Sequence, residues 1–260
     1  MRRLLGLARS FLIYYGIPGR QRRLRAMYGQ FLNSGDLAFD IGAHLGNRVK
    51  AISALGARVV AAEPHPDCLR VLRGLFGNDE RVQIEPTAVG GAEGQTSLYI
   101  CEGSPTLSTV SGSWIEHVRQ SSMFEGIRWD RNVEVPVTTL DRLIERHGRP
   151  QFIKIDVEGH EPQVLEGLSQ PVPALSFEFL PASRETALAC IDRLEALGRY
   201  RFNYSMVETM RLASASWLDA RDMRAALRAM PDNGRSGDVY AVLSDRFTDG
   251  RYSSPSSRVQ

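Results

Sequence analysis

A short apolar strand that ends in a glycine-containing turn is the feature that most constrains the fold of this chain. Residues 37–41 form the pattern of a buried strand, and Gly42 and Gly46 follow it. Gly42 permits a sharp backbone turn, and Gly46 lets the next helix start close to a ligand. A second apolar run, 59–62, ends in Glu63, about 20 residues after the first glycine, where a carboxylate can accept both hydroxyls of a ribose. The pattern predicts a βαβ unit that binds a nucleoside.

The spacing of the glycines indicates which nucleoside cofactor fits. Dinucleotide sites favour G-x-G-x-x-G, because a pyrophosphate must lie against bare backbone. Here His44 stands at the middle glycine position, and Asp40 precedes the turn, so both bulk and charge oppose a pyrophosphate. S-adenosylmethionine has no phosphate, and its positive sulfonium is attracted by nearby carboxylates. The pattern therefore favours S-adenosylmethionine, although the glycine pair alone is also compatible with a purely structural turn.

A second group of polar residues lies at the end of another strand pattern, expected at 152–156. Asp156, Glu158, His160 and Glu161 lie within six residues of one another. In an open α/β sheet, ligands bind outside the carboxyl ends of the strands, so this group is expected to face the same crevice as the glycine turn. The alternative is that the acidic residues only favour the N-terminus of the next helix, expected at 162–168, through its dipole. Capping does not require a histidine beside three carboxylates, and we therefore expect a functional cluster.

Five segments resemble, in the expected order, the motifs of a known family. They are residues 39–46, 62–66, 87–94, 137–141 and 153–161. The chain is similar on these segments to the FkbM family of S-adenosylmethionine-dependent methyltransferases. The similarity covers about residues 35–180 and continues more weakly to Leu243. The last segment is the most family-specific. His44 and Gly91 depart from the family pattern, which more often has Asn and Asp at these positions.

The resemblance implies a fold, a cofactor and a reaction. The fold is α/β: the Rossmann-like class I methyltransferase fold, a doubly wound sheet that is mostly parallel with an antiparallel last strand. The reaction is usually O-methylation of a hydroxyl on a sugar, glycolipid or polyketide-type small molecule. The residues expected to bind S-adenosylmethionine are Asp40, Gly42, Ala43, His44, Gly46, Asn47, Glu63, Pro64, Thr87, Ala88 and Asp156.

The chemistry of methyl transfer to a hydroxyl suggests roles for the second cluster. An alcohol loses a proton during the reaction, and a histidine that titrates near neutrality is a suitable acceptor. We expect His160 to be this base, with Asp156 as the alternative base or as its orienting partner. A divalent metal on Asp156, Glu158 and Glu161 could instead lower the hydroxyl pKa, although no sequence feature requires one. Amino-group methylation of bases is disfavoured, because the Asn/Asp-Pro-Pro-aromatic run of such enzymes is absent at this strand end.

Composition agrees with one enzyme domain. A chain of 260 residues with 43% hydrophobic residues can bury a full α/β core, and a net charge of +2 gives no overall attraction to nucleic acid. The three cysteines are scattered, without metal spacing, which is typical of reduced thiols in a cytoplasmic protein. The basic residues are almost all Arg, as expected from a GC-rich bacterial genome.

The N-terminal segment 1–34 is predicted to be a basic helical extension. Residues 1–30 hold seven Arg and no acidic residue. The apolar stretch 11–15 is too short to span a bilayer, and no small-residue cleavage site follows it. We expect a helix that caps the edge or mouth of the core, with a basic amphipathic helix on an anionic membrane as the alternative. The tail 246–260 is expected to be disordered.

The methyltransferase domain is expected over residues 35–245. Its connection 101–132 is too long for an ordinary loop and is a candidate substrate lid. Trp114 and Trp129 in this lid, together with Glu158, are the expected substrate contacts, although each Trp is also compatible with plain packing. Two other functions remain open: an NAD-type oxidoreductase, and an inactive methyltransferase-fold protein that binds a partner through its basic helix.

Overall fold

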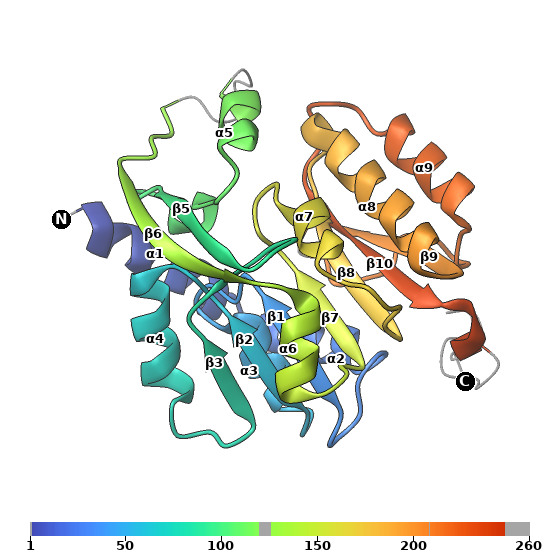
Figure 1. Ribbon diagram of the computed structural model, residues 1–260, viewed down its shortest axis with the longest axis horizontal. Coiled ribbons are helices and arrows are strands. Elements are labelled where there is room, and N and C mark those ends of the chain that lie inside the picture. The colour runs from blue at the N-terminus through green and yellow to red at the C-terminus, as the bar shows by residue number, and fades with distance from the viewer. Residues whose placement is uncertain (1, 120–125, 208, 248–260) are drawn as a thin grey trace.

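A seven-stranded sheet forms the centre of the molecule (Figure 1). The computed structural model describes residues 2–119, 126–207 and 209–247. The strand order is β3-β2-β1-β7-β8-β10-β9, and every neighbouring pair is parallel except the two that involve β10. The strands are β1 (Leu37–Ile41), β2 (Arg58–Ala62), β3 (Val82–Glu85), β7 (Phe152–Ile155), β8 (Ala174–Phe179), β9 (Tyr200–Met206) and β10 (Gly237–Leu243). The predicted fold class, including its antiparallel last strand, is confirmed.

Helices cover both faces of this sheet, because its central strands are apolar on both sides. On β1, Phe39 and Ile41 belong to one hydrophobic cluster and Ala38 to the other. The first face packs against α6 (Leu140–His147), α7 (Glu161–Glu166), α8 (Arg184–Leu197) and α9 (Ala220–Ala229). The second packs against α2 (Arg20–Tyr28), α3 (Asn47–Ser53) and α4 (Pro66–Phe76). Figure 1 shows α6, α7 and α8 in front of the sheet and α2 and α3 behind it.

A smaller sheet stands beside the main one and carries the predicted lid. It has the order β4-β6-β5, formed by β4 (Ala88–Val89), β5 (Gly94–Ile100) and β6 (Arg131–Thr138). The connection between β5 and β6 contains the 3-10 helix η1 (Pro105–Leu107) and the helix α5 (Gly112–Val118). Residues 120–125 of the predicted lid lie outside the described residues.

The N-terminal segment is divided into two helices with different environments. α2 buries Leu24, Met27 and Tyr28 against the main sheet, so this part of the predicted N-terminal extension packs on the core. α1 (Arg2–Tyr15) lies outside this core, where the Tyr15 hydroxyl donates a hydrogen bond to the Leu45 carbonyl at 2.8 Å. Among the described residues, no helix combines the length and apolar character needed to cross a membrane.

The C-terminal end of the described chain packs against the core. The 3-10 helix η4 (Ser244–Phe247) follows β10, and the Phe247 ring meets the edge of Trp217 at a centroid distance of 5.6 Å. The predicted start of the disordered tail, residue 246, is therefore too early, because residues 246 and 247 belong to η4. Residues 248–260, the rest of that predicted tail, lie outside the described residues.

Candidate active site

The turn after β1 requires glycine because it lies against the end of β7. Gly42 has a φ of 82°, and a Cβ atom there would lie 1.9 Å from the Asp156 carbonyl oxygen. A side chain would therefore face both backbone strain and a collision with main chain. The Asp156 amide donates to the Ile41 carbonyl at 2.9 Å, which continues the β1–β7 pairing beyond the strands. The two motifs identified in the sequence are thus in direct backbone contact.

Glu63, at the end of β2, holds the glycine turn in place. Its Oε2 accepts a hydrogen bond from the His44 amide and its Oε1 from the His65 amide, both at 2.7 Å. Burial raises the pKa of this carboxyl to about 7, while the two amide donors act in the opposite direction. A carboxylate has about four lone-pair sites, so two remain for further donors. The arrangement is compatible with two ribose hydroxyls.

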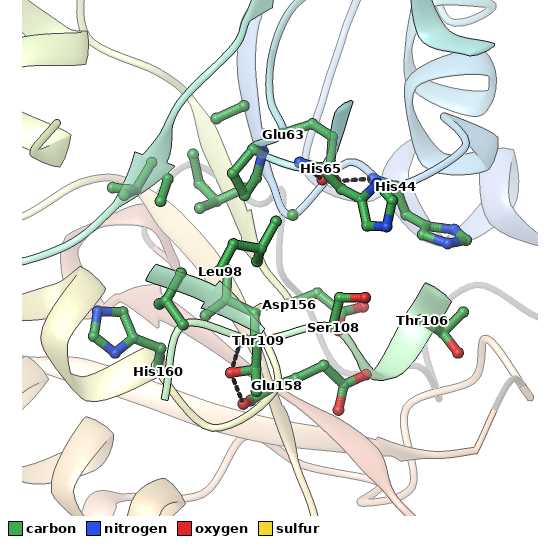
Figure 2. Close-up of a pocket in the computed structure, with 18 of the residues that line it drawn as sticks. His44, Glu63, His65, Leu98, Thr106, Ser108, Thr109, Asp156, Glu158 and His160 are labelled. Atoms are coloured by element: carbon green, nitrogen blue, oxygen red, sulfur yellow. Dashed lines mark hydrogen bonds between the residues drawn. The ribbon is translucent and has the colours of Figure 1, made fainter. Parts of the chain in front are cut away.

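These elements line a cavity, here called the inner cavity. Figure 2 shows Glu63, His65 and His44 along one wall and Asp156, Glu158 and His160 along the other. The predicted cofactor residues that line it are Gly42, His44, Glu63, Pro64, Thr87, Ala88 and Asp156.

The other four predicted cofactor residues do not line the inner cavity. Ala43 packs in the core behind the turn, and a Cβ on Gly46 would collide with Phe76 and Leu72 of α4. Asn47 is buried at the start of α3, and Asp40 is fully buried on β1. These four residues therefore lie outside the cavity wall, around the turn.

Asp40 belongs to a group of buried charges beneath the cavity. It is directly opposite Lys154 in the β1–β7 register, and burial raises its pKa to about 6, although Arg48 and Lys154 act to lower it. The Lys154 Nζ donates to Asp238 Oδ1 at 2.6 Å, so the ammonium is paired across β8. An ionised Asp40 would place negative charge near the cofactor site.

The Asp156 carboxylate pairs with the side chains of Arg48 and Lys154 and not with His160. Its Oδ2 lies 2.9 Å from an Arg48 nitrogen and 3.5 Å from Lys154 Nζ. Burial alone would raise the pKa of Asp156, but the two cations outweigh it and hold the pKa below its usual range. Asp156 is therefore a weak base, and the expectation that it orients His160 is wrong.

Three carboxylates meet at the carboxyl ends of β7 and β8. One oxygen each of Asp156, Glu158 and Glu178 lie within 4.8 Å of one another. Burial, together with the charge of Asp156, holds the pKa values of Glu158 and Glu178 well above their usual range. Such a group holds protons or a cation, because three adjacent carboxylates cannot all ionise unpaired.

Glu161 is turned away from this cluster, although we expected it among the metal ligands. Its Oε1 accepts hydrogen bonds from the Val157 amide at 3.1 Å and from the Gly159 amide at 3.3 Å. Glu161 thus stabilises the turn between β7 and α7. Glu178, which our sequence analysis missed, takes its place in the cluster.

His160 lines the inner cavity but lies away from the carboxylates. Its Nε2 lies 3.4 Å from the position that a Cβ on Gly90 would occupy. Figure 2 shows its ring and the Glu158 carboxylate on opposite sides of the loop. Burial lowers the His160 pKa, which favours the neutral form of the ring.

A second hollow, here called the outer cavity, opens beside the lid. Its wall includes Trp114 of α5, Glu178 and Phe179 of β8, and Arg235. Trp114 packs against Gly159, where a Cβ would lie 2.1 Å from the indole. Trp129, also expected to contact substrate, lies outside both cavities: its indole N–H donates to the Leu107 carbonyl at 2.8 Å and so stabilises the lid itself.

The inner and outer cavities meet at Glu158. Tyr14, Thr106 and Glu158 line both of them. Glu158 is held in a left-handed conformation with a φ of 55°, and the Thr109 hydroxyl donates to its carbonyl oxygen at 2.8 Å. Tyr14 reaches the junction from α1, where its ring meets the edge of the His44 ring at a centroid distance of 5.3 Å.

Several of these site residues escaped the sequence analysis, and only one had a readable signal. Glu178 is the penultimate residue of an otherwise buried strand, ALSFEF, and such an acid at a strand end resembles the pattern that identified Asp156. Arg48, Thr109 and Tyr14 carry no comparable signal. They reach the site only through the packing of α3, the lid and α1.

The strand order, the glycine turn and the acidic end of β2 together form the Rossmann-like arrangement of the class I methyltransferase fold. The sequence profile of the methyltransferase FkbM domain matches residues 40–229, and the chain belongs to this family. Membership sets aside the oxidoreductase alternative.

One relative with a described activity is the hexuronic acid methyltransferase AglP of Haloferax volcanii. It is 27% identical over 157 residues, which cover 55% of this chain and 54% of that protein. The match therefore spans about half the length of either protein.

Solved structures resemble the chain only loosely. The precorrin-6Y C5,15-methyltransferase of Geobacter metallireducens has a TM-score of 0.46 at 11% identity, over 85% of this chain and 86% of that one. An O-methyltransferase of Bacillus cereus in complex with SAH has a TM-score of 0.43 at 13% identity, over 92% and 90%. RNA methyltransferases score similarly, so these likenesses do not distinguish between acceptors.

Proposed function

We propose that the chain transfers the methyl group of S-adenosylmethionine to a hydroxyl oxygen of a saccharide. The observation that carries this proposal is the pair of cavities that share Tyr14, Thr106 and Glu158. The cofactor would occupy the inner cavity and the acceptor the outer one, so that the methyl group crosses beside Glu158. Holding the methyl carbon and the acceptor oxygen about 3 Å apart and in line supplies much of the acceleration in such a displacement.

The inner cavity offers a partner for each part of the cofactor. Glu63 would accept the ribose hydroxyls through its two remaining lone-pair sites. Pro64, Thr87 and Ala88 would border the adenine, because they follow β2 and β3 beside Glu63. Gly42 and Asp156 would border the methionyl part, because both line the inner cavity where β1 and β7 end.

The outer cavity has the composition expected of a sugar site. Trp114 and Phe179 offer apolar rings for C–H faces, and hydroxyl residues such as Ser183 and Thr186 line the same wall. Arg235 is the cation among its described lining residues. Since AglP is a hexuronic acid methyltransferase, we propose a uronic acid as the acceptor sugar, with Arg235 pairing its carboxylate. A hydroxyl of a glycolipid or of a polyketide-type molecule would be a methyl acceptor of the same chemical kind.

Glu158 is the proton acceptor that the geometry supports best. It touches both cavities, whereas His160 lines only the inner one. Asp156 is held by Arg48 and Lys154. The raised pKa of Glu158 makes its ionised form a stronger base than an ordinary carboxylate. His160 is the alternative base.

A divalent cation is a second route to activating the hydroxyl. Asp156, Glu158 and Glu178 form the oxygen-only donor set that Mg²⁺ and Ca²⁺ prefer. Turnover that is lost after chelation and returns with Mg²⁺ would identify this route, and unchanged turnover would exclude it.

The test is methyl transfer from labelled S-adenosylmethionine to a panel of sugars with and without a carboxylate. Glu158→Gln should lower turnover by about 10²–10⁴-fold, with His160→Ala remaining within a few-fold of the unsubstituted chain. The reverse pattern would assign the base to His160. A uronic acid also offers a carboxylate oxygen, which needs no base, so the product is treated with mild alkali: an ester is cleaved and an ether is not. Cofactor binding without transfer to any acceptor would favour the inactive, partner-binding alternative.

A further inference from the structure

The first helix leaves an apolar face uncovered beside the two cavities. Phe11, Leu12, Ile13 and Ile17 are 40%, 68%, 45% and 45% exposed. Among the described residues, Leu75 on α4 is the other large apolar side chain that is exposed. Concentration of such side chains on one short element is typical of an interaction surface. Three of them lie on α1 and Ile17 lies two residues beyond its end; these four residues are called the α1 apolar face below.

The opposite side of α1 is packed on the domain, so the helix is held in position. A Cβ on Gly6 would lie 2.4 Å from the Glu102 carbonyl oxygen, which shows how closely the helix approaches the lid. The Tyr15 hydroxyl is bonded to Leu45, and Tyr14 lines both cavities. The α1 apolar face therefore lies outward while its other side borders the mouth of the site.

The segment that carries this face has charge of one sign. Residues 1–30 contain seven Arg and no acidic residue. Arg9, Arg22, Arg23 and Arg25 are exposed, and Arg23 Nη1 lies 3.6 Å from the Cβ position of Gly19, in the same turn as Ile17. An apolar face bordered by arginines is complementary to an anionic lipid surface. A second copy of the chain would bring arginines against arginines, which opposes self-association.

We propose that the α1 apolar face docks in the headgroup region of an anionic membrane, and that the acceptor is a saccharide carried on a lipid. The second clause rests on the proposed function. Docking through α1 would bring Tyr14, and with it the mouth of the outer cavity, to the height at which a lipid-linked sugar leaves the bilayer.

Vesicle sedimentation of the full chain tests the docking. We expect binding to phosphatidylcholine vesicles that contain phosphatidylglycerol, weaker binding at high salt, and little binding to phosphatidylcholine alone. Leu12→Ser with Ile13→Ser should lower the partition coefficient at least about tenfold, because both side chains would otherwise leave water. Leu75→Ser on α4 is the matched control and should change nothing.

The charge contribution is tested separately. Arg22→Glu with Arg23→Glu should weaken binding to the anionic vesicles about tenfold or more, whereas Arg73→Glu, an exposed arginine on α4, should not. S-adenosylhomocysteine affinity should be the same in all variants, which shows that they are folded. Vesicle binding that survives the Leu12 and Ile13 substitutions would overturn the inference. So would a dimer of the unsubstituted chain that these substitutions convert to a monomer, since the face would then be a subunit interface.

Methyl transfer completes the test. A saccharide linked to lipid in vesicles should be methylated at least tenfold faster than the same saccharide free in solution, and Leu12→Ser with Ile13→Ser should remove only this advantage. Equal rates on both acceptors would refute the lipid-linked substrate and leave the proposed function standing. Vesicle binding without methylation of any acceptor would refute the proposed function and leave the docking surface standing.

Discussion

Buried ionisable side chains set the chemistry of the inner cavity at the scale of single residues. Glu63, Asp40 and Glu158 all have pKa values raised by burial, whereas two cations hold Asp156 ionised. The site thus combines one carboxylate that stays ionised, Asp156, with carboxyls whose protonation can change when a ligand binds. The cofactor should therefore change the protonation of the protein.

Glu63→Gln should weaken the binding of S-adenosylhomocysteine by about 1–3 kcal/mol, because it replaces a charged acceptor by a neutral amide. The ionised form of Glu63 is the better acceptor for ribose hydroxyls. Binding should therefore release protons below pH 7, and affinity should rise with pH until the pKa of about 7 is passed. Calorimetry in buffers of different ionisation enthalpy measures both effects. Glu145→Gln, an exposed carboxylate on α6, is the control, and a pH dependence that persists in Glu63→Gln would contradict the assignment.

At the scale of elements, the loop after β7, which carries Glu158, is held by segments far from it in sequence. The loop after β7 is fixed by the turn after β1 on one side and by the lid on the other. The Thr109 hydroxyl is buried and bonds both the Glu158 carbonyl and the Ser111 amide. This side chain joins the lid to the proposed base.

Thr109→Val should lower the free energy of unfolding by about 1–3 kcal/mol, because it leaves a buried carbonyl and a buried amide without their partner. It should also lower kcat more than it changes S-adenosylhomocysteine affinity, because the position of Glu158 is relaxed. Thr109→Ser keeps the hydroxyl and should restore kcat. A Ser variant as slow as the Val variant would show that packing of the methyl group, and not the hydrogen bond, is what matters.

At the scale of the whole molecule, a buried ion pair connects the two halves of the sheet. Lys154 on β7 and Asp238 on β10 are 84 residues apart in sequence and meet at 2.6 Å across β8. Burial opposes the charge of Lys154, yet Asp156 and Asp238 raise its pKa above the usual value. The pair ties the antiparallel last strand to the centre of the site.

Lys154→Met should cost about 3–5 kcal/mol of stability, since Asp238 would be left buried without its cation. Lys154→Met combined with Asp238→Leu should recover part of the loss, because Asp238 is then no longer stranded, whereas Asp156 keeps only Arg48 as its cation. Chemical denaturation of the single and double variants measures this difference. Arg142→Met, in the exposed pair with Glu145, should cost less than about 1 kcal/mol. A double variant that is as unstable as the single one would refute the pairing argument.

The amino-acid sequence by itself determined the class of fold, the family and the two motifs that form the inner cavity. Those features depend on local rules: alternating apolar runs, a glycine that no other residue can replace, and acids at strand ends. Gly42, Glu63 and Asp156 were found in this way, and the β1 bounds matched the expected range 37–41. Residues within a motif share one short stretch of backbone, so their proximity needs no knowledge of packing.

Only the tertiary structure decided which side chains face the chemistry. The sequence grouped His160 and Glu161 with Asp156, yet the turn before α7 directs His160 toward Gly90 and Glu161 toward backbone amides. The tertiary structure also places Glu178 beside Glu158, although the two are 20 residues apart in sequence. The physical reason is that a turn sends adjacent side chains in different directions, whereas parallel strands bring distant chain segments to one edge of the sheet.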